Sequence, residues 1–420
     1  MVFRQLFLWF LTTGFAVATP AASSPLADIF AGRTAATAGL SGLVIVVADR
    51  RGVVRSEAFG AASFDPQRPL APTTPLRVAS ISKAVVAIGV MRLVEAGKLD
   101  LDSDVSRWLG WSLRHPKHGD VPVTLRQLLS HTSGIVDGPG YAFPLEATLK
   151  GSLTAEHWSE LVPGGRFAYA NLNYGIIAGI MEAATGERFD RLMTRLVLAP
   201  LDIDAGYNWR GASDAAVAAA ATLYRTGKDE TDWHPRGPWV AQVDALGGVR
   251  PACPVRATGA CDLDAYVPGS NGTLFSPQGG LRVSALGLTK IGRMLLGAGV
   301  VDGVRLISPA SVAALTTPVW QATGRPGDDT YNGQMLCYGA GLHCLTGSHD
   351  SPVPGARWSG HLGEAYGLLA GLWIDRQNDR VFVYALTGTR DDPFKPPHAS
   401  AFTAVEENIL AELAATPRQR

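Results

Sequence analysis

The order of apolar and polar positions predicts strands at both ends of the chain and helices between them. Residues 43–48 and 53–59 are rich in Val, Ile, Ala and Phe, and they flank the polar stretch 49–52, which is typical of a hairpin turn. A second hairpin is predicted at 368–374 and 381–386, with polar residues at its turn. Both pairs have the composition of half-buried strands.

The middle of the chain has the periodicity of helices. The clearest helical segments, together with a last helix near the C-terminus, are 84–96, 174–184, 189–198 and 401–415. Gly97 and Gly186 mark the ends of two of them. Strands at the two ends with helices between them favour an α+β fold, because the ends can then meet in one sheet.

We therefore expect an antiparallel sheet formed by the N- and C-terminal segments, flanked by helices, with a mainly helical domain inserted between them. The α/β part is expected at about 25–79 and 270–415, and the helical part at about 80–269. Residues 208–269 are rich in Gly, Pro, Trp and Asp and show little periodicity. We expect this segment to be a loop insertion at the surface, pinned by a disulfide.

Composition and charge favour a globular protein that acts on small molecules. The chain has 420 residues, of which 46% are hydrophobic and 18% charged, enough for one large domain or two. Lys plus Arg and Asp plus Glu both number 37, so the chain lacks the excess positive charge that nucleic acid or an anionic membrane attracts. The sequence carries no signal for a particular oligomeric state.

The N-terminus resembles a secretory signal peptide over residues 1–18. A positive charge at Arg4 precedes an apolar run at 6–17, and Ala16-Val17-Ala18 has the small residues of a cleavage site. The run is shorter than the roughly 20 residues of a spanning helix. An uncleaved membrane anchor is the alternative. Both interpretations place the body of the protein in the periplasm or outside the cell, with no stable membrane span after cleavage of a signal.

The four cysteines fit an oxidising compartment. Cys253 and Cys261 lie eight residues apart, Cys337 and Cys344 seven apart, and each pair lies in a Pro/Gly-rich segment. Local pairing within each segment is the simplest of three connectivities. A metal site is disfavoured because the chain has no Cys-x-x-Cys spacing.

A lysine at the start of an otherwise apolar helix is the first sign of chemistry. Residues 84–94 are apolar on nearly all sides of the predicted helix, so Lys83 is expected to be buried at its first turn. A buried ammonium needs a partner or loses its proton easily. Ser80 lies three positions earlier, over the same face, so its hydroxyl and the amine are within reach of each other.

Two further motifs follow in order. Tyr169 and Asn171 lie two apart before a predicted helix, where extended backbone would point both side chains to one side. His361-Leu362-Gly363 comes shortly before the second hairpin. The sequence lacks Gly-x-Ser-x-Gly and His-Glu-x-x-His, so neither an α/β-hydrolase nucleophile elbow nor a zinc hydrolase is supported.

Ser-x-x-Lys, Tyr-x-Asn and His-x-Gly, with Ser130-His131-Thr132-Ser133-Gly134 between the first two, resemble the serine β-lactamase and penicillin-binding protein superfamily. The similar branch contains class C β-lactamases, DD-peptidases and family VIII esterases. The resemblance runs from about residue 38 to the last helix and includes 275–281 and 306–312. It implies a β-lactamase/transpeptidase-like fold over 25–415 and a serine hydrolase that works through an acyl-enzyme without metal or cofactor.

The resemblance also implies a role for each motif residue. Ser80 would be the acylated nucleophile, Lys83 its partner, Tyr169 the second-motif tyrosine and Asn171 the amide that orients the substrate. His361 and Gly363 would form the third motif, and the backbone N–H groups of Ser80 and Glu364 would hold the oxyanion. Whether Lys83 or Tyr169 removes the serine proton is left open by the sequence.

Each motif residue also has a purely structural interpretation. Ser80 could cap a helix, Lys83 could reach solvent along its stem, and Tyr169 with Asn171 could form a turn and cap. For His131 we expect a structural, hydrogen-bonded role rather than a catalytic one. His115 and His118 with Asp120 are more typical of solvated loop residues than of metal ligands.

The third motif departs from the resembled families. Class C β-lactamases have Lys-Thr-Gly and related DD-peptidases His-Thr-Gly, whereas here Leu362 replaces the hydroxyl that would meet a substrate carboxylate. Glu364 adds a negative charge. Both changes disfavour anionic substrates and favour neutral esters, amides or amine-bearing substrates, unless an arginine, for instance from 208–269, restores carboxylate binding.

The leading hypothesis is an exported esterase or amidase acting on a small molecule or a cell-wall-derived peptide. A DD-peptidase or D-aminopeptidase comes next, followed by a class C-like β-lactamase. The alternative from another class is an inactive penicillin-binding-like domain that binds cell-wall peptide.

Overall fold

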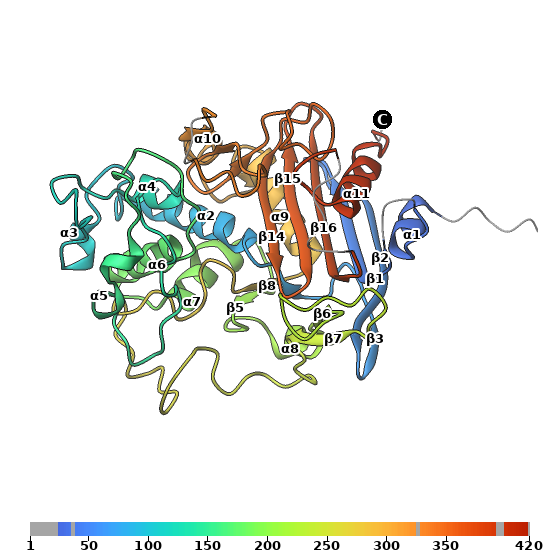
Figure 1. The fold of residues 1–420 in the computed structure, drawn as a ribbon, viewed down its shortest axis with the longest axis horizontal. Coiled ribbons are helices and arrows are strands. Elements are labelled where there is room, and N and C mark those ends of the chain that lie inside the picture. The colour runs from blue at the N-terminus through green and yellow to red at the C-terminus, as the bar shows by residue number, and fades with distance from the viewer. Residues whose placement is uncertain (1–23, 35–37, 325–327, 392–398, 419–420) are drawn as a thin grey trace, which may run out of the picture.

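One large antiparallel sheet forms the body of the protein (Figure 1). The structure is a computed structural model that describes residues 24–34, 38–324, 328–391 and 399–418, so the expected signal segment 1–18 lies outside the described residues. Within these ranges the sheet has nine strands in the order β11-β12-β13-β14-β15-β16-β1-β2-β3. Their bounds are β1 Leu40–Ala48, β2 Val53–Phe64, β3 Gln67–Pro69, β11 Trp320–Gln321, β12 Cys337–Tyr338, β13 His343–Cys344, β14 Ser359–Ala365, β15 Leu368–Asp375 and β16 Arg380–Thr389.

The N- and C-terminal hairpins meet at the centre of this sheet. β1 pairs with β2 on one side and with β16 on the other, both antiparallel, and Ile45 lies opposite Tyr384 across the β1–β16 pair. The predicted hairpins and their junction are therefore confirmed. All of β1 is buried because helices cover both faces of the sheet at this point.

Alternate residues of β1 belong to different cores. Val44 and Val46 pack in the core that includes the long helices α2 and α9, whereas Ile45 and Val47 pack in the core beneath α1 and α11. The bounds of these helices are α1 Pro25–Phe30, α2 Ile81–Glu95, α9 Ala285–Leu296 and α11 Ala404–Ala414. The two-sided burial explains why the strand reads as a continuous apolar run.

The helical region lies beside the sheet, on the left in Figure 1. α2 is its central helix, and apolar side chains are buried around its whole circumference, as the sequence predicts. The other elements of this region are α3 Ser106–Leu109, α4 Leu125–Leu129, α5 Leu149–Ser152, η1 Ala155–His157, α6 Leu172–Thr185, α7 Phe189–Met193 and η2 Thr194–Leu198. The helix predicted at 189–198 is thus an α-helix that continues as a π-helical turn.

The remaining elements are short. They are β4 Leu76–Arg77, β5 Gly206–Tyr207, α8 Asp214–Ala218, β6 Leu223–Arg225, β7 Val240–Val243, β8 Leu281–Val283, β9 Val300–Val301, β10 Val304–Arg305 and α10 Pro309–Thr316. Segment 208–269 therefore contains a helix and a two-stranded sheet where the sequence predicts only loop. β8 lies between β4 and β5 and joins the residues before α2 to those just before segment 208–269. No helix of the described ranges is long and apolar enough to cross a membrane.

Candidate active site

A strained turn places Ser80 at the start of α2. Ala79 has φ +44°, a left-handed conformation that is uncommon for a residue with a Cβ. Ser80 itself is in the right-handed helical region, and its side chain makes no capping hydrogen bond. Among the described residues, its backbone N–H also has no acceptor. The amide of Ser80 is therefore free to meet a substrate, and its hydroxyl is not occupied by a helix cap.

Lys83 lies beneath this hydroxyl. Its Nζ donates to Ser80 Oγ at 2.9 Å, to Asn171 Oδ1 at 2.8 Å and to the backbone carbonyl of Gln278 at 3.1 Å. The side chain is fully buried, so it does not reach solvent along its stem. Burial lowers the pKa of Lys83 to about 7, although the charge of Asp137 acts in the opposite direction. A substantial fraction of the amine is therefore neutral near pH 7 and can accept a proton.

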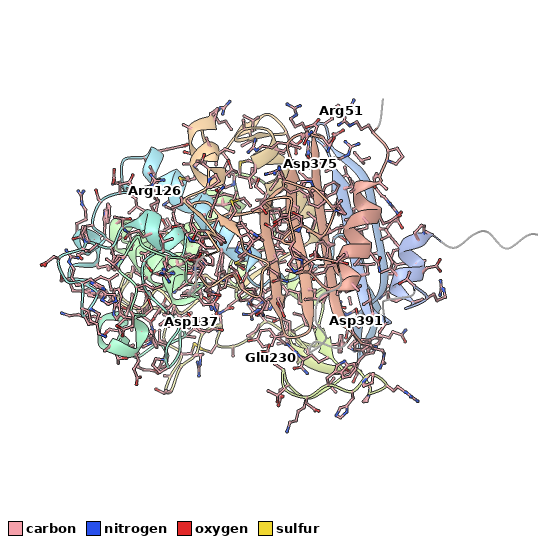
Figure 2. The ribbon with its side chains drawn as sticks, turned by 45° about the horizontal axis from the view of Figure 1, so that its top comes forward. Arg51, Arg126, Asp137, Glu230, Asp375 and Asp391 are labelled. Atoms are coloured by element: carbon pink, nitrogen blue, oxygen red, sulfur yellow. A yellow bond between two sulfur atoms is a disulfide. The ribbon has the colours of Figure 1, made fainter. Side chains whose placement is uncertain are left out.

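Asp137 orients Asn171, and sequence reasoning missed it. Asn171 is the first residue of the turn that opens α6 and has helical backbone angles rather than the expected extended ones. Its Nδ2 donates to one oxygen of Asp137 at 2.9 Å, while the backbone N–H of Leu172 donates to the other at 2.9 Å. This bridge directs the Asn171 oxygen toward Lys83. Figure 2 shows Asp137 where the helical region meets the sheet.

Tyr169 lies against Lys83 with its hydroxyl unsatisfied. The ring centroid is 4.8 Å from Lys83 Nζ. The buried phenol oxygen has no hydrogen-bond partner among the described residues. Burial raises the pKa of Tyr169 well above its usual value, and the nearby Ser80 hydroxyl offsets this in part without meeting hydrogen-bond geometry. The phenol therefore stays protonated at neutral pH.

His131 packs against the Tyr169 ring and binds the backbone on the N-terminal and C-terminal sides of this tyrosine. Its ring lies 4.4 Å from the Tyr169 ring, its Nδ1 accepts from the Ala170 N–H at 3.1 Å, and its carbonyl accepts from the Ala168 N–H at 2.8 Å. Burial and the Lys83 charge hold the pKa of His131 well below its usual value, so the ring is neutral. These contacts fit the structural role that the sequence favours for this histidine.

Strand β14 closes the other side of the site. A Cβ at Gly363 would overlap the Val78 carbonyl oxygen, so glycine lets β14 approach the turn that carries Ser80. Glu364 follows Gly363 on this strand, so its backbone lies near the same turn. His361 is fully buried, and its Nε2 lies 2.8 Å from the Tyr338 hydroxyl.

The side chains that the sequence links to substrate choice have different surroundings. Leu362 is 5% exposed and packs in the core beneath α1 and α11, so it is a core residue rather than a wall of the cleft. Glu364 remains exposed to solvent. Partial desolvation, with repulsion from Glu406 and Glu230, raises the pKa of Glu364 to about 7. Glu364 can therefore repel an anionic substrate, whereas the buried Leu362 does not face one.

Other polar clusters do not form a metal site. No group of three or more His, Cys, Asp or Glu side chains within the described ranges could hold a metal ion. His115 Nε2 lies 2.8 Å from the Ser159 carbonyl and is a structural contact. The structure contains the disulfides Cys253–Cys261 and Cys337–Cys344, which are the local pairs that the sequence predicts.

Comparison with known proteins places this fold and site in a family. A family model described as Beta-lactamase matches residues 26–404. The chain belongs to the Beta-lactamase family. This membership confirms the superfamily that the three motifs resemble and the α+β fold expected from the order of elements.

Curated members of the Beta-lactamase family are similar over part of their length. Esterase EstB of Burkholderia gladioli is 31% identical over 188 residues, 40% of this chain and 47% of that protein. Penicillin-binding protein 4* of Bacillus subtilis is 29% identical over 164 residues, 37% of this chain and 35% of that protein. The matched stretch thus spans less than half the length of each relative.

Solved structures share the fold along most of the chain. D-amino acid amidase from Ochrobactrum anthropi SV3, complexed with L-phenylalanine amide, has a TM-score of 0.65 at 18% identity and covers 93% of this chain and 96% of its own. The octameric penicillin-binding protein homologue from Pyrococcus abyssi has a TM-score of 0.64 at 20% identity. The match covers 93% of this chain and 76% of that homologue.

Proposed function

We propose that the chain is a serine hydrolase that cleaves an ester or an amide through an acyl-enzyme on Ser80. The observation that carries this proposal is the 2.9 Å contact between Lys83 Nζ and Ser80 Oγ in a buried site. A serine attacks only when a base removes its proton, and an amine with a pKa of about 7 is suited to this task at neutral pH.

The proposed reaction has two steps. Ser80 Oγ attacks the substrate carbonyl carbon and gives its proton to neutral Lys83, while the backbone N–H groups of Ser80 and Glu364 hold the oxyanion. The alcohol or amine then leaves with a proton, and the acyl group stays on Ser80. Water attacks the acyl-enzyme, releases the carboxylic acid and regenerates the serine. Lys83 is the base in this scheme because Tyr169 stays protonated at neutral pH.

Tyr169 is proposed to carry the proton to the leaving group. Tyr169→Phe should lower kcat/KM for ethyl butyrate by about 10², the range for lost acid–base help. The loss should be much smaller for p-nitrophenyl butyrate, since p-nitrophenolate leaves without a proton. Parallel kinetics on both esters checks this. Equal losses on the two substrates would mean that Tyr169 acts by packing alone.

Amine-bearing amides are a second candidate substrate class. The observation in their favour is the exposed carboxylate of Glu364 at the edge of β14, next to the proposed oxyanion site. One panel tests both classes: p-nitrophenyl butyrate, 3-phenylpropionamide and D-phenylalanine amide at pH 7. Turnover of the ester supports the hydrolase, and failure to turn over any of the three contradicts it.

The two amides in this panel differ only by an ammonium group. A preference for D-phenylalanine amide that Glu364→Gln lowers by about 2- to 5-fold, the range of one exposed ion pair, favours the second class. An unchanged preference excludes a role for Glu364 in amine binding.

We also propose that the chain is exported to the periplasm or secreted. Two disulfides support this, because such bonds persist in oxidising compartments. Mass spectrometry of the mature N-terminus should find cleavage near Ala18, and an intact Met1 on cytosolic protein would contradict export.

A further inference from the structure

A cavity lies beside the residues that hold the proposed nucleophile. Its volume is about 810 Å³, within the range of small-molecule sites, and its walls include residues 139–143, 251 and 253–256. Gln278, whose backbone carbonyl accepts from Lys83, also lines it. The cavity is therefore adjacent to the catalytic groups and is bounded in part by the loop that the Cys253–Cys261 disulfide closes.

Arg77 lines this cavity and has no hydrogen-bond or ion-pair partner among the described residues. It lies on β4, three residues before Ser80, and its guanidinium carbon is 4.9 Å from the centre of the Tyr366 ring. No hydrogen bond or ion pair joins its guanidinium to another residue of the described ranges, and its Nε is buried and unsatisfied. A charged group held in this way lacks the compensation that buried charges normally have.

The neighbouring arginine is fully engaged. Arg282, opposite Arg77 in the β4–β8 pair, donates to both oxygens of Asp244 at 3.0 and 3.1 Å. Its Nη1 donates to Asn208 Oδ1 at 2.6 Å and to the Gly280 carbonyl at 2.9 Å. Asp244 is the one carboxylate among the residues that line the cavity, and Arg282 neutralises it.

The cavity therefore has an excess of positive charge. Arg77, Arg256 and Arg282 face a single carboxylate. Arg256 uses its Nη1 to hold the Ala142 carbonyl at 3.1 Å. Burial, with repulsion from Arg282, lowers the pKa of Arg77 to about 10, so the guanidinium is still charged at neutral pH. Arg77 is the guanidinium in this set that makes no hydrogen bond to another described residue.

We propose that this cavity is an anion subsite in which Arg77 binds a carboxylate on the substrate whose ester or amide bond reaches Ser80. A guanidinium offers paired N–H donors that match a carboxylate, and the Tyr366 ring lies against the Arg77 guanidinium. The inference rests on the proposed function for its link to catalysis. The sequence predicts that Leu362 and Glu364 disfavour anionic substrates unless an arginine, for instance from 208–269, binds the carboxylate. In this proposal Arg77, which lies outside that segment, is the arginine that binds it.

Binding is tested first without turnover. In a Ser80→Ala background, succinate should bind in calorimetric titration at low salt, whereas the neutral analogue succinamide should bind at least about tenfold more weakly. Adding Arg77→Met should weaken succinate binding by about tenfold or more, and Arg77→Lys should restore part of it. Arg50→Met is the matched control, because Arg50 is exposed in the β1–β2 turn and its guanidinium pairs with Asp379, away from the residues that line the cavity.

The control site is remote from the cavity. Arg50 is not among the residues that line the cavity, and its neighbour Arg51 lies at the top of the sheet in Figure 2. Equal succinate affinity in Arg77→Met and Arg50→Met, with both variants folded by circular dichroism, would overturn the subsite. Equal binding of succinate and succinamide would overturn it as well.

Turnover then separates this proposal from the proposed function. The neutral ester is p-nitrophenyl butyrate, and the anionic esters carry the carboxylate on the acyl side (p-nitrophenyl hemisuccinate) or on the leaving group (3-butyryloxybenzoate). Arg77→Met should lower kcat/KM of one anionic ester, relative to the neutral ester, by about tenfold or more. Unchanged ratios for both overturn the subsite and leave the hydrolase intact. Succinate binding without turnover of any ester supports the subsite and contradicts the hydrolase.

Discussion

Ser80→Ala should abolish labelling by a fluorophosphonate probe and lower kcat/KM for p-nitrophenyl butyrate by on the order of 10⁴ to 10⁶, as expected for loss of a catalytic nucleophile. The reason is geometric. Among the described residues, the Ser80 hydroxyl is the one that Lys83 Nζ contacts, and it makes no capping bond that would occupy it. Intact-protein mass after treatment with the probe gives the result directly.

Ser82→Ala is the matched control, because it makes the same substitution in the same turn of α2. Ser82 Oγ accepts from the Leu281 N–H at 3.0 Å and is buried away from Lys83, so this variant loses one structural hydrogen bond. We expect a loss of about 1 kcal/mol in the free energy of unfolding, with labelling retained. A mass shift that survives in Ser80→Ala would place the nucleophile elsewhere.

Lys83→Met should lower kcat/KM by about 10² to 10⁴ and remove the acid limb of the pH profile. In the wild type, kcat/KM should rise as pH increases through about 7, because the neutral amine is the active form. Lys83→Arg keeps a positive charge but cannot give up its proton, so it should be as inactive as the methionine variant. A wild-type profile that is flat from pH 5 to 9 would contradict the role of Lys83 as base.

The same substitution should change stability with a defined pH dependence. Folding lowers the pKa of Lys83 from 10.5 to about 7, so the unfolded state binds more protons between these values, and wild-type stability should rise with pH across this window. Lys83→Met lacks this dependence. Its melting temperature should exceed that of the wild type near pH 7, and the difference should shrink toward pH 10.

Local patterns were sufficient for the strands and for the long helices. β1 and α2 are buried on all sides, so their continuous apolar runs identify them directly. α8 and the β6–β7 pair could not be predicted, because short elements in a Gly- and Pro-rich segment depend on tertiary contacts rather than on periodicity. The π-helical end of the helix at 189–198 likewise leaves no trace in the apolar pattern.

In the candidate site, too, contacts between residues close in sequence could be predicted and contacts between distant residues could not. Ser80 and Lys83 are one helical turn apart, so their contact follows from spacing. Asp137 and Asn171 are 34 residues apart and meet only through the fold. Gln278 contributes a backbone carbonyl, which has no side-chain signature at all. The sequence could not show that Arg77 lacks an ion-pair partner, because this depends on Asp244 pairing with the neighbouring Arg282 in the fold.

The bond between Lys83 and the Gln278 carbonyl joins positions 195 residues apart, and β14 completes the site later still along the chain. A polypeptide cut short before β14 would hold the proposed nucleophile and base but would lack the strand that faces them. During synthesis, the proposed hydrolase would therefore stay inactive until nearly all of the chain has emerged and closed into the sheet. Esterase activity would consequently report on complete assembly and not on the partial folding of either half.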